Sequence, residues 1–209
     1  MREEALELLK KYTKSDSLIK HAFAVEAGMR AYAKKYGADE DRWAAVGLLH
    51  DVDYEMYPEE HPMKGVEILE AAGYDDEFVK AVQGHADYTD TERESQMAKV
   101  LYAVDEFASF IVTVALVRPT KLEGMKYKSV KKKFKSKAFA EAIDRDHLEK
   151  SVKELGEDFV DHVNLLINEL QNHEAYLNKK GYSLVEWWLV PHHIFNDTCA
   201  QVYFQKILT

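Results

Sequence analysis

The chain has 209 residues, of which 46% are hydrophobic and 31% charged, so a disordered chain is excluded and one domain of unusual length is predicted. Its formal net charge of -9 excludes a general nucleic-acid binder or a membrane-surface protein. A single cysteine, Cys199, excludes an internal disulfide framework. The charged N-terminus lacks a signal-peptide core, and the longest uncharged apolar run, 107–117, is shorter than the roughly 20 residues that span a bilayer. We therefore expect a cytoplasmic protein with no membrane segment.

Helical periodicity and helix stop signals run along almost the whole chain. Asp16 and Asp39 are suitable N-caps for the first two strongly periodic segments, and Gly37 is a suitable left-handed end for the first. The segment 97–117 is the most apolar and is therefore predicted to be the most buried. The predicted helices are 16–37, 40–52, 62–73, 76–85, 97–117 and a long one over 146–180. No strand alternation competes, so the fold class predicted is all-α.

The predicted domain covers residues 1–182, with a core over 15–115 and an accessory helical part over 116–182. In the accessory part, the basic segment 118–137 carries nine Lys or Arg against one acid, Glu123. This segment is either a solvated helix face or a patch that holds a phosphate-bearing small molecule.

The last residues, 183–209, hold only three charges and no helical repeat. They are an interaction segment, a native extension packed on the domain, or sequence added for expression, and the sequence leaves these alternatives open. We assign no functional residue to this extension, and that exclusion covers His192 and His193.

Several imidazoles and carboxylates lie on apolar helix faces or at predicted helix ends. Each alone has a structural explanation, such as a histidine whose hydrogen bonds are satisfied in the core. Together they are typical of a site for a borderline divalent metal such as Mn, Fe, Co, Ni or Zn, without the thiolates of a structural cysteine site. The residues are His21, His50, Asp51, His61, His85 and Asp105. His50 and Asp51 point about 100° apart on a helix, so they can flank one ion, and Asp51 has a second oxygen for another.

The ordered pattern of His21, then His50-Asp51, then Asp105 resembles the H…HD…D signature of the HD superfamily of metal-dependent phosphohydrolases, over roughly residues 15 to 115. The stretch HPMKGVEIL, which begins at His61, is similar to a segment of the HDIG-type members. The resemblance implies an HD-domain helical bundle in which His21, His50, Asp51 and Asp105 hold one metal. It also implies a second metal at His61 and His85, bridged by Asp51. The chain departs from the HDIG pattern at 52–53, where Val-Asp replaces Ile-Gly, and it lacks the Gly-Tyr-Pro triplet of the cyclic-dinucleotide branch.

The function expected from this resemblance is metal-dependent hydrolysis of a nucleotide or another small phosphate ester. Two alternatives remain, an HD-type di-iron oxygenase and a non-enzymatic nucleotide-binding module. The candidate catalytic residues are Asp51, Asp53 and Glu55, and the candidate cations for substrate phosphate are Lys64, Arg118, Lys121 and Lys126. Asp53 and Glu55 are equally interpretable as exposed loop acids, and solvated surface charge is the favoured interpretation of the four cations. The sequence leaves the oligomeric state open.

Overall fold

Helices make up most of the part of the chain that the computed structural model describes, residues 1–186, and no strand occurs in it. They are α1 (Arg2–Tyr12), α2 (Asp16–Tyr36), α3 (Glu40–Leu49), α4 (Met63–Ala71), α5 (Asp76–Gln83), α6 (Gln96–Leu116), α7 (Tyr127–Phe134), α8 (Arg145–Leu155) and α9 (Phe159–Asn178). Two short 3₁₀ helices span Pro58–Glu60 and Asp87–Thr89. The all-α prediction is confirmed. None of the helices in residues 1–186 has the length and hydropathy needed to cross a membrane.

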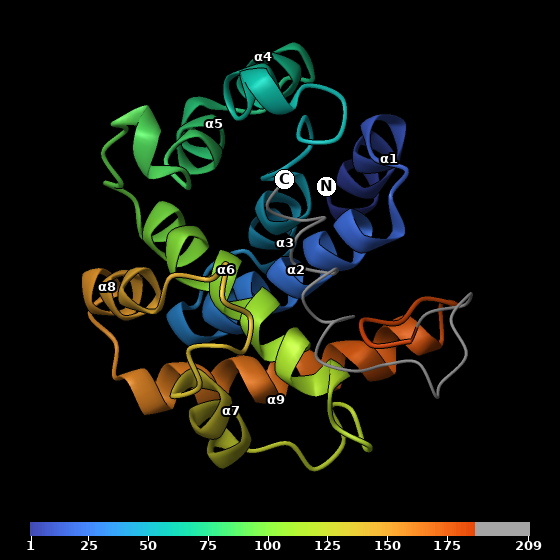
Figure 1. The fold of residues 1–209 in the computed structure, drawn as a ribbon. Coiled ribbons are helices and arrows are strands. Elements are labelled where there is room, and N and C mark those ends of the chain that lie inside the picture. The colour runs from blue at the N-terminus through green and yellow to red at the C-terminus, as the bar shows by residue number, and fades with distance from the viewer. Residues whose placement is uncertain (187–209) are drawn as a thin grey trace.

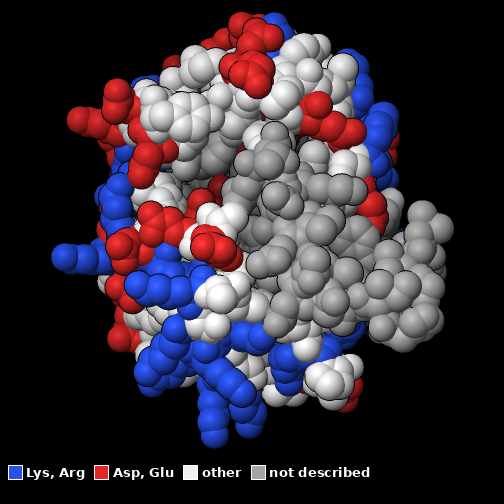
Figure 2. Space-filling view, in the orientation of Figure 1, with Lys and Arg blue, Asp and Glu red and all other residues white. Residues whose placement is uncertain are grey.

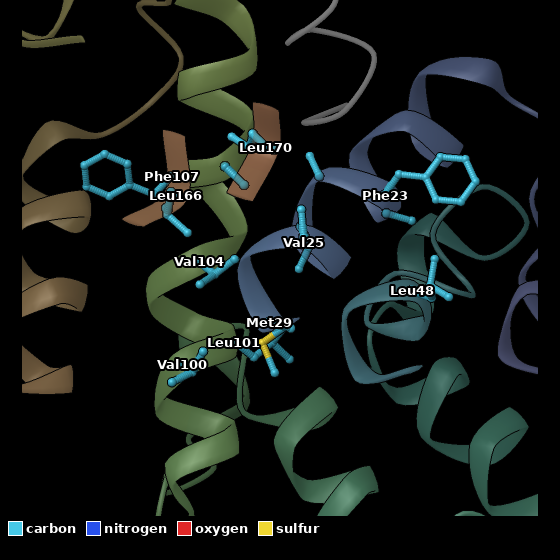
Figure 3. Close-up of a cluster of buried hydrophobic side chains, with 14 of the residues drawn as sticks. Phe23, Val25, Met29, Leu48, Val100, Leu101, Val104, Phe107, Leu166 and Leu170 are labelled. Atoms are coloured by element: carbon cyan, nitrogen blue, oxygen red, sulfur yellow. The ribbon is translucent and has the colours of Figure 1, made fainter. Parts of the chain in front are cut away.

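Helices α2 and α6 form the centre of the molecule (Figure 1). Helix α2 packs against α3, α6 and α9, and α6 also packs against α5 and α8. Figure 3 shows Val104 of α6 facing Val25 and Met29 of α2, and Phe107 on another side of α6, with Leu166 of α9 close by. All of these side chains are buried, as predicted for the most apolar segment.

A close approach fixes the end of α3 against α2. A Cβ atom added at Gly47 of α3 would lie 2.8 Å from the Cα of Glu26 in α2, closer than real Cβ contacts. Glycine has no Cβ atom, so it allows the backbone at the C-terminal end of α3 to lie directly against the backbone of α2. This contact holds His50, which follows α3, near His21 of α2.

Of the two predicted N-caps, the structure confirms Asp39 and replaces Asp16 by Ser15. The carboxylate of Asp39 accepts hydrogen bonds from the N–H groups of Asp41 and Arg42, so the predicted cap of α3 is confirmed. The N-cap of α2 is Ser15 and not Asp16, whose carboxylate instead lies 2.6 Å from the ammonium of Lys20.

The prediction of one long helix over 146–180 is wrong. Gly156 adopts a left-handed conformation, φ 81°, and ends α8. The carboxylate of Asp158 then accepts hydrogen bonds from the N–H groups of Val160 and Asp161 and begins α9. The break lets α9 return across the molecule and pack on α2.

The first residues of the predicted extension pack on the helical domain. Leu184 and Val185 are buried, and the Ser183 hydroxyl donates a hydrogen bond to Glu174 of α9. The rest of the extension, 187–209, with His192, His193 and Cys199, lies outside the described residues.

His162 of α9 is a buried neutral histidine, and a pH dependence of stability follows from it. Burial lowers its pKa from 6.5 to about 3, although Glu157 partly opposes the shift, and the Tyr32 hydroxyl lies 2.6 Å from its Nδ1. The folded state therefore binds fewer protons than the unfolded state between these pH values. The stabilisation is complete above pH 6.5 and is lost as the pH falls below it, by about 1.4 kcal/mol per unit.

We expect the free energy of unfolding of the wild type to fall by about 2 kcal/mol more than that of His162→Gln between pH 6.5 and 5. Urea unfolding at the two pH values measures this difference, and contributions from other titrating groups cancel between the two proteins. Equal losses in both proteins would show that His162 is not kept neutral by the fold.

Candidate metal centre

Helix ends and helix faces bring all six predicted ligands to one place. His21 lies on α2, and Asp105 lies in the middle of α6. His50 and Asp51 follow directly after α3, where the chain turns. His61 precedes α4 and His85 follows α5. Every histidine of the set is at least nine-tenths buried at its side chain, so the cluster lies inside the helical bundle.

The first group of ligand atoms surrounds a single point. The Nε2 atoms of His21 and His50 lie 2.9 Å apart. The Oδ2 of Asp51 lies 3.3 Å from each of these nitrogens. The Oδ1 of Asp105 lies 3.1 Å from the Nε2 of His21 and 3.3 Å from that of His50. The ligand atoms of His21, His50 and Asp51 are mutually close enough to hold one divalent ion, and the Asp105 oxygen lies beside both histidine nitrogens.

The second group uses the other oxygen of the same carboxylate. The Oδ1 of Asp51 lies 3.3 Å from the Nε2 of His85 and 3.5 Å from the Nε2 of His61. Asp51 therefore faces both groups, one through each oxygen, and each group could hold a metal ion.

Hydrogen bonds behind the histidines orient their rings. The Nδ1 of His21 lies 2.7 Å from the Ser109 hydroxyl, and the Nδ1 of His50 lies 2.9 Å from the carbonyl oxygen of Gly47. The Nδ1 of His85 donates to the carbonyl oxygen of Val82. With Nδ1 carrying the proton, each Nε2 presents a lone pair to the cluster, which is the arrangement that metal-ligating histidines need.

The electrostatic field of the cluster favours positive charge at its centre. Burial opposes protonation of His21 and His50, but Asp105 and Asp51 outweigh it and raise the pKa of both rings. Burial likewise opposes ionisation of the two carboxyls, but the histidines hold the pKa of Asp51 and Asp105 well below the usual range. A field that attracts a proton to these nitrogens also attracts a metal cation. These nitrogen and oxygen donors therefore fit divalent metal ions. That the protein binds two ions stays a prediction.

Asp53 and Glu55, the other two catalytic candidates, have structural partners and do not line the cavity beside the cluster. Asp53 is fully buried, and its carboxylate accepts hydrogen bonds from the Nδ1 of His61 at 2.8 Å and from the N–H of Gly65 at 2.6 Å. The carboxylate of Glu55 accepts hydrogen bonds from the N–H groups of Lys14 and Ser15, just before α2. Asp53 therefore positions His61, and Glu55 fixes the start of α2.

We expect Asp53→Asn to weaken the metal affinity of the His61 and His85 group by about ten- to hundredfold, because the amide orients His61 less strongly than the carboxylate does. Glu55→Gln is the matched control and should leave metal affinity unchanged. Each protein is freed of metal with a chelator and titrated with Mn in a calorimeter, which measures the metal affinity of both variants. A role of Glu55 in the centre would appear as an equal loss in the two variants.

The structure does not bring the four predicted phosphate-binding cations to the cavity beside the cluster. The ammonium of Lys64 lies 2.6 Å from the carboxylate of Glu67 on the surface of α4. Arg118 donates to the carbonyl oxygens of Lys121 and Glu123 in the loop after α6. Lys126 is exposed at the start of α7. The geometry gives no support to their predicted role.

The basic segment covers a different face of the molecule. Lys and Arg side chains gather at the lower edge of the view in Figure 2, where α7 lies in Figure 1. Asp105 and Leu116, the last residue of α6, are separated by about 16 Å along the helix axis. Helix α7 lies within this segment, in line with the alternative of a solvated helix face.

A cavity of about 270 Å³ opens beside the two ligand groups. Besides five of the ligands, its lining includes residues that the sequence analysis did not select, namely Tyr54, Ala86, Asp87, Tyr88, Glu106, Ser109 and His147. Glu106 follows the predicted ligand Asp105 directly in sequence, so its position near the cluster could have been predicted. His147 comes from α8, far along the chain, and no sequence pattern connects it with the cluster.

Residues 18–109 match the family model of the HD domain. This part of the chain is an HD domain. The matched residues contain all six predicted ligands. An HD domain suggests a superfamily of hydrolases that bind divalent metal ions, and the two groups of His and Asp could hold such ions. His147 and the rest of α7 to α9 lie beyond the HD domain.

One curated relative is the tRNA (cytidine(56)-2'-O)-methyltransferase of Thermoplasma volcanium, which is 40% identical over 81 residues. The alignment covers 38% of this chain and 24% of that protein, so the chain spans about a quarter of the length of this relative. No solved structure matches the chain significantly.

Proposed function

We propose that this HD-domain protein is a metal-dependent phosphohydrolase that acts on a nucleotide or another small phosphate ester. The observation that carries the proposal is the Asp51 carboxylate, which directs one oxygen to each of two ligand groups beside an open cavity. When bound, divalent ions would lower the pKa of a water molecule and stabilise negative charge on phosphoryl oxygens.

The residues of the chain prepare the site for that chemistry. His50 is fully buried and closes the inner side of the site against bulk water. Ser109 and the carbonyl oxygens behind the histidines keep each Nε2 directed at the centre. The pair Asp51 and Asp105 provides the negative charge that retains cations at the inner end of the cavity. Within the described residues, the cavity gives a substrate phosphoryl group a route to the cluster.

Phosphate release from a panel of esters tests the proposal. Protein treated with a chelator and then reloaded with Mn, Co or Fe is incubated with nucleoside mono-, di- and triphosphates, sugar phosphates and phosphorylated oligoribonucleotides. The oligoribonucleotides are included because the curated relative is named as a tRNA-modifying enzyme. Metal-dependent release from at least one ester is expected, and no release from any of them in the reloaded protein would contradict the proposal.

A di-iron oxygenase is the second candidate, because His61 and His85 complete a second ligand group with Asp51. The resemblance to HD-type proteins with all six ligands implies this alternative. Oxygen consumption by iron-loaded protein, without phosphate release, would favour this candidate. Tight binding of a nucleotide with neither reaction would favour a non-enzymatic module.

A further inference from the structure

The outer wall of the cavity contains polar side chains in addition to the predicted metal ligands. Glu106 of α6 and His147 of α8 line it together with Asp87 and Tyr88. His147 lies outside the HD domain, so the accessory helices complete the pocket. A substrate whose phosphoryl group enters the metal centre must extend past this wall.

Glu106 is the first group with unused hydrogen-bonding capacity. It follows Asp105 directly on α6, and its Oε2 is buried without a hydrogen-bond partner among the described residues. A buried carboxyl oxygen without a partner costs free energy, and a ligand hydroxyl removes that cost. Glu106 is therefore placed to hydrogen-bond a ligand.

His147 is the second such group. Its ring packs edge-on against the ring of Tyr102, with centroids 4.9 Å apart, and its Nδ1 lies 3.5 Å from the Tyr102 hydroxyl. Tyr102 is itself fixed by a hydrogen bond of 2.8 Å to Asp87. The Nε2 of His147 makes no hydrogen bond with any described residue, so the oriented ring keeps one nitrogen for a ligand.

Positive charge is missing from this wall. No Lys or Arg lines the cavity within the described part of the chain. Two cations at the rim are already paired with Asp87, Lys150 at 3.0 Å and Arg93 at 3.1 Å. Arg93 also donates to both carboxylate oxygens of Glu154. A second or third phosphate would reach this wall without a free cation from residues 1–186 to neutralise it.

Resting on the proposed function, we propose that the substrate is a phosphomonoester with one phosphoryl group, whose uncharged, hydroxyl-bearing alcohol binds between Glu106 and His147. Two divalent ions would carry more charge than the Asp51 and Asp105 carboxylates offset, and one phosphomonoester dianion would bring further negative charge to balance them. In hydrolysis, water supplies the hydroxyl group that bonds to phosphorus while the ester P–O bond breaks. The proton goes to the alcohol oxygen, so the products are inorganic phosphate and the free alcohol.

Calorimetry on metal-loaded protein tests this recognition independently of turnover. The probes are inorganic phosphate and the non-hydrolysable phosphonate analogue of adenosine 5'-monophosphate. In both Glu106→Gln and His147→Ala, we expect the analogue to bind at least tenfold more weakly and inorganic phosphate to bind within twofold of the wild type. The matched control is Lys153→Ala, an exposed position of α8 outside the pocket, which should change neither affinity.

A charge series completes the experiment. The corresponding non-hydrolysable triphosphate analogue should bind at least tenfold more weakly than the monophosphonate. Equal or tighter binding of the triphosphate analogue, or unchanged binding of the monophosphonate in both variants, would overturn the inference. These outcomes are separable from failure of the proposed function, in which the binding pattern holds but no ester is hydrolysed.

Discussion

Asp51→Ala is expected to lose both bound metal ions, because one side chain supplies an oxygen to each ligand group. His85→Ala removes a ligand from the second group alone and should lose one ion. Mass-spectrometric metal analysis after gel filtration, on protein loaded with Mn and freed of excess, measures the stoichiometry. The first group keeps His21, His50 and Asp105 in His85→Ala, so its ion is expected to remain.

A structural control accompanies these variants. Glu55→Gln changes an acidic residue that lies close in sequence but bonds to the backbone before α2, so it should keep the metal content of the wild type. Circular dichroism should show native helix content in every variant, since Asp51→Ala and His85→Ala remove polar groups that line a cavity and Glu55→Gln keeps the size of the side chain. Unchanged metal content in both Asp51→Ala and His85→Ala would refute the assignment of these ligands.

Metal loading is expected to raise the midpoint of thermal unfolding by about 8–16 °C. Binding to the folded state alone stabilises it by about 4 kcal/mol at a free metal concentration 1,000 times the dissociation constant. For a domain of this size, each kcal/mol shifts the midpoint by about 2–4 °C. The physical cause is that only the folded state holds the imidazole nitrogens and the carboxylate oxygen about 3 Å apart, where one ion can bind them together.

Differential scanning fluorimetry of chelated and Mn-loaded protein measures this shift. Asp51→Ala should show almost none of it at the same Mn concentration, whereas Lys153→Ala should show all of it. A shift of wild-type size in Asp51→Ala would mean that the stabilising ion binds at another place.

The sequence was informative where local chemistry determines structure. The apolar face of 97–117 predicted the buried α6, and Asp39 predicted the start of α3, because these signals act over a few residues. The cluster of predicted metal ligands was also accessible from sequence, since buried His and Asp at helix ends need partners. Their ordered spacing then matched the HD pattern, which the family model supports over 18–109.

Other features depend on contacts between distant segments and have no local signal. From sequence, Asp53 could be an exposed acid close to the His50-Asp51 pair. In the fold it is buried, and its carboxylate accepts hydrogen bonds from His61 and from the N–H of Gly65. The break at Gly156 was hidden by apolar spacing that continues on both sides of it. His147 enters the pocket only because α8 packs on α6, which is a consequence of tertiary structure.

Stepwise metal reloading with parallel measurement of phosphate release tests the central claim most directly. Protein freed of metal with a chelator receives Mn in increments. The amount of bound Mn and the rate of phosphate release from a phosphomonoester are then measured on the same samples. We predict no release without metal, and activity that reaches its maximum at two bound ions per chain in the wild type and stays absent in Asp51→Ala. Release of phosphate at the full rate by metal-free protein, or by Asp51→Ala, would contradict the assignment of this centre as the hydrolytic site.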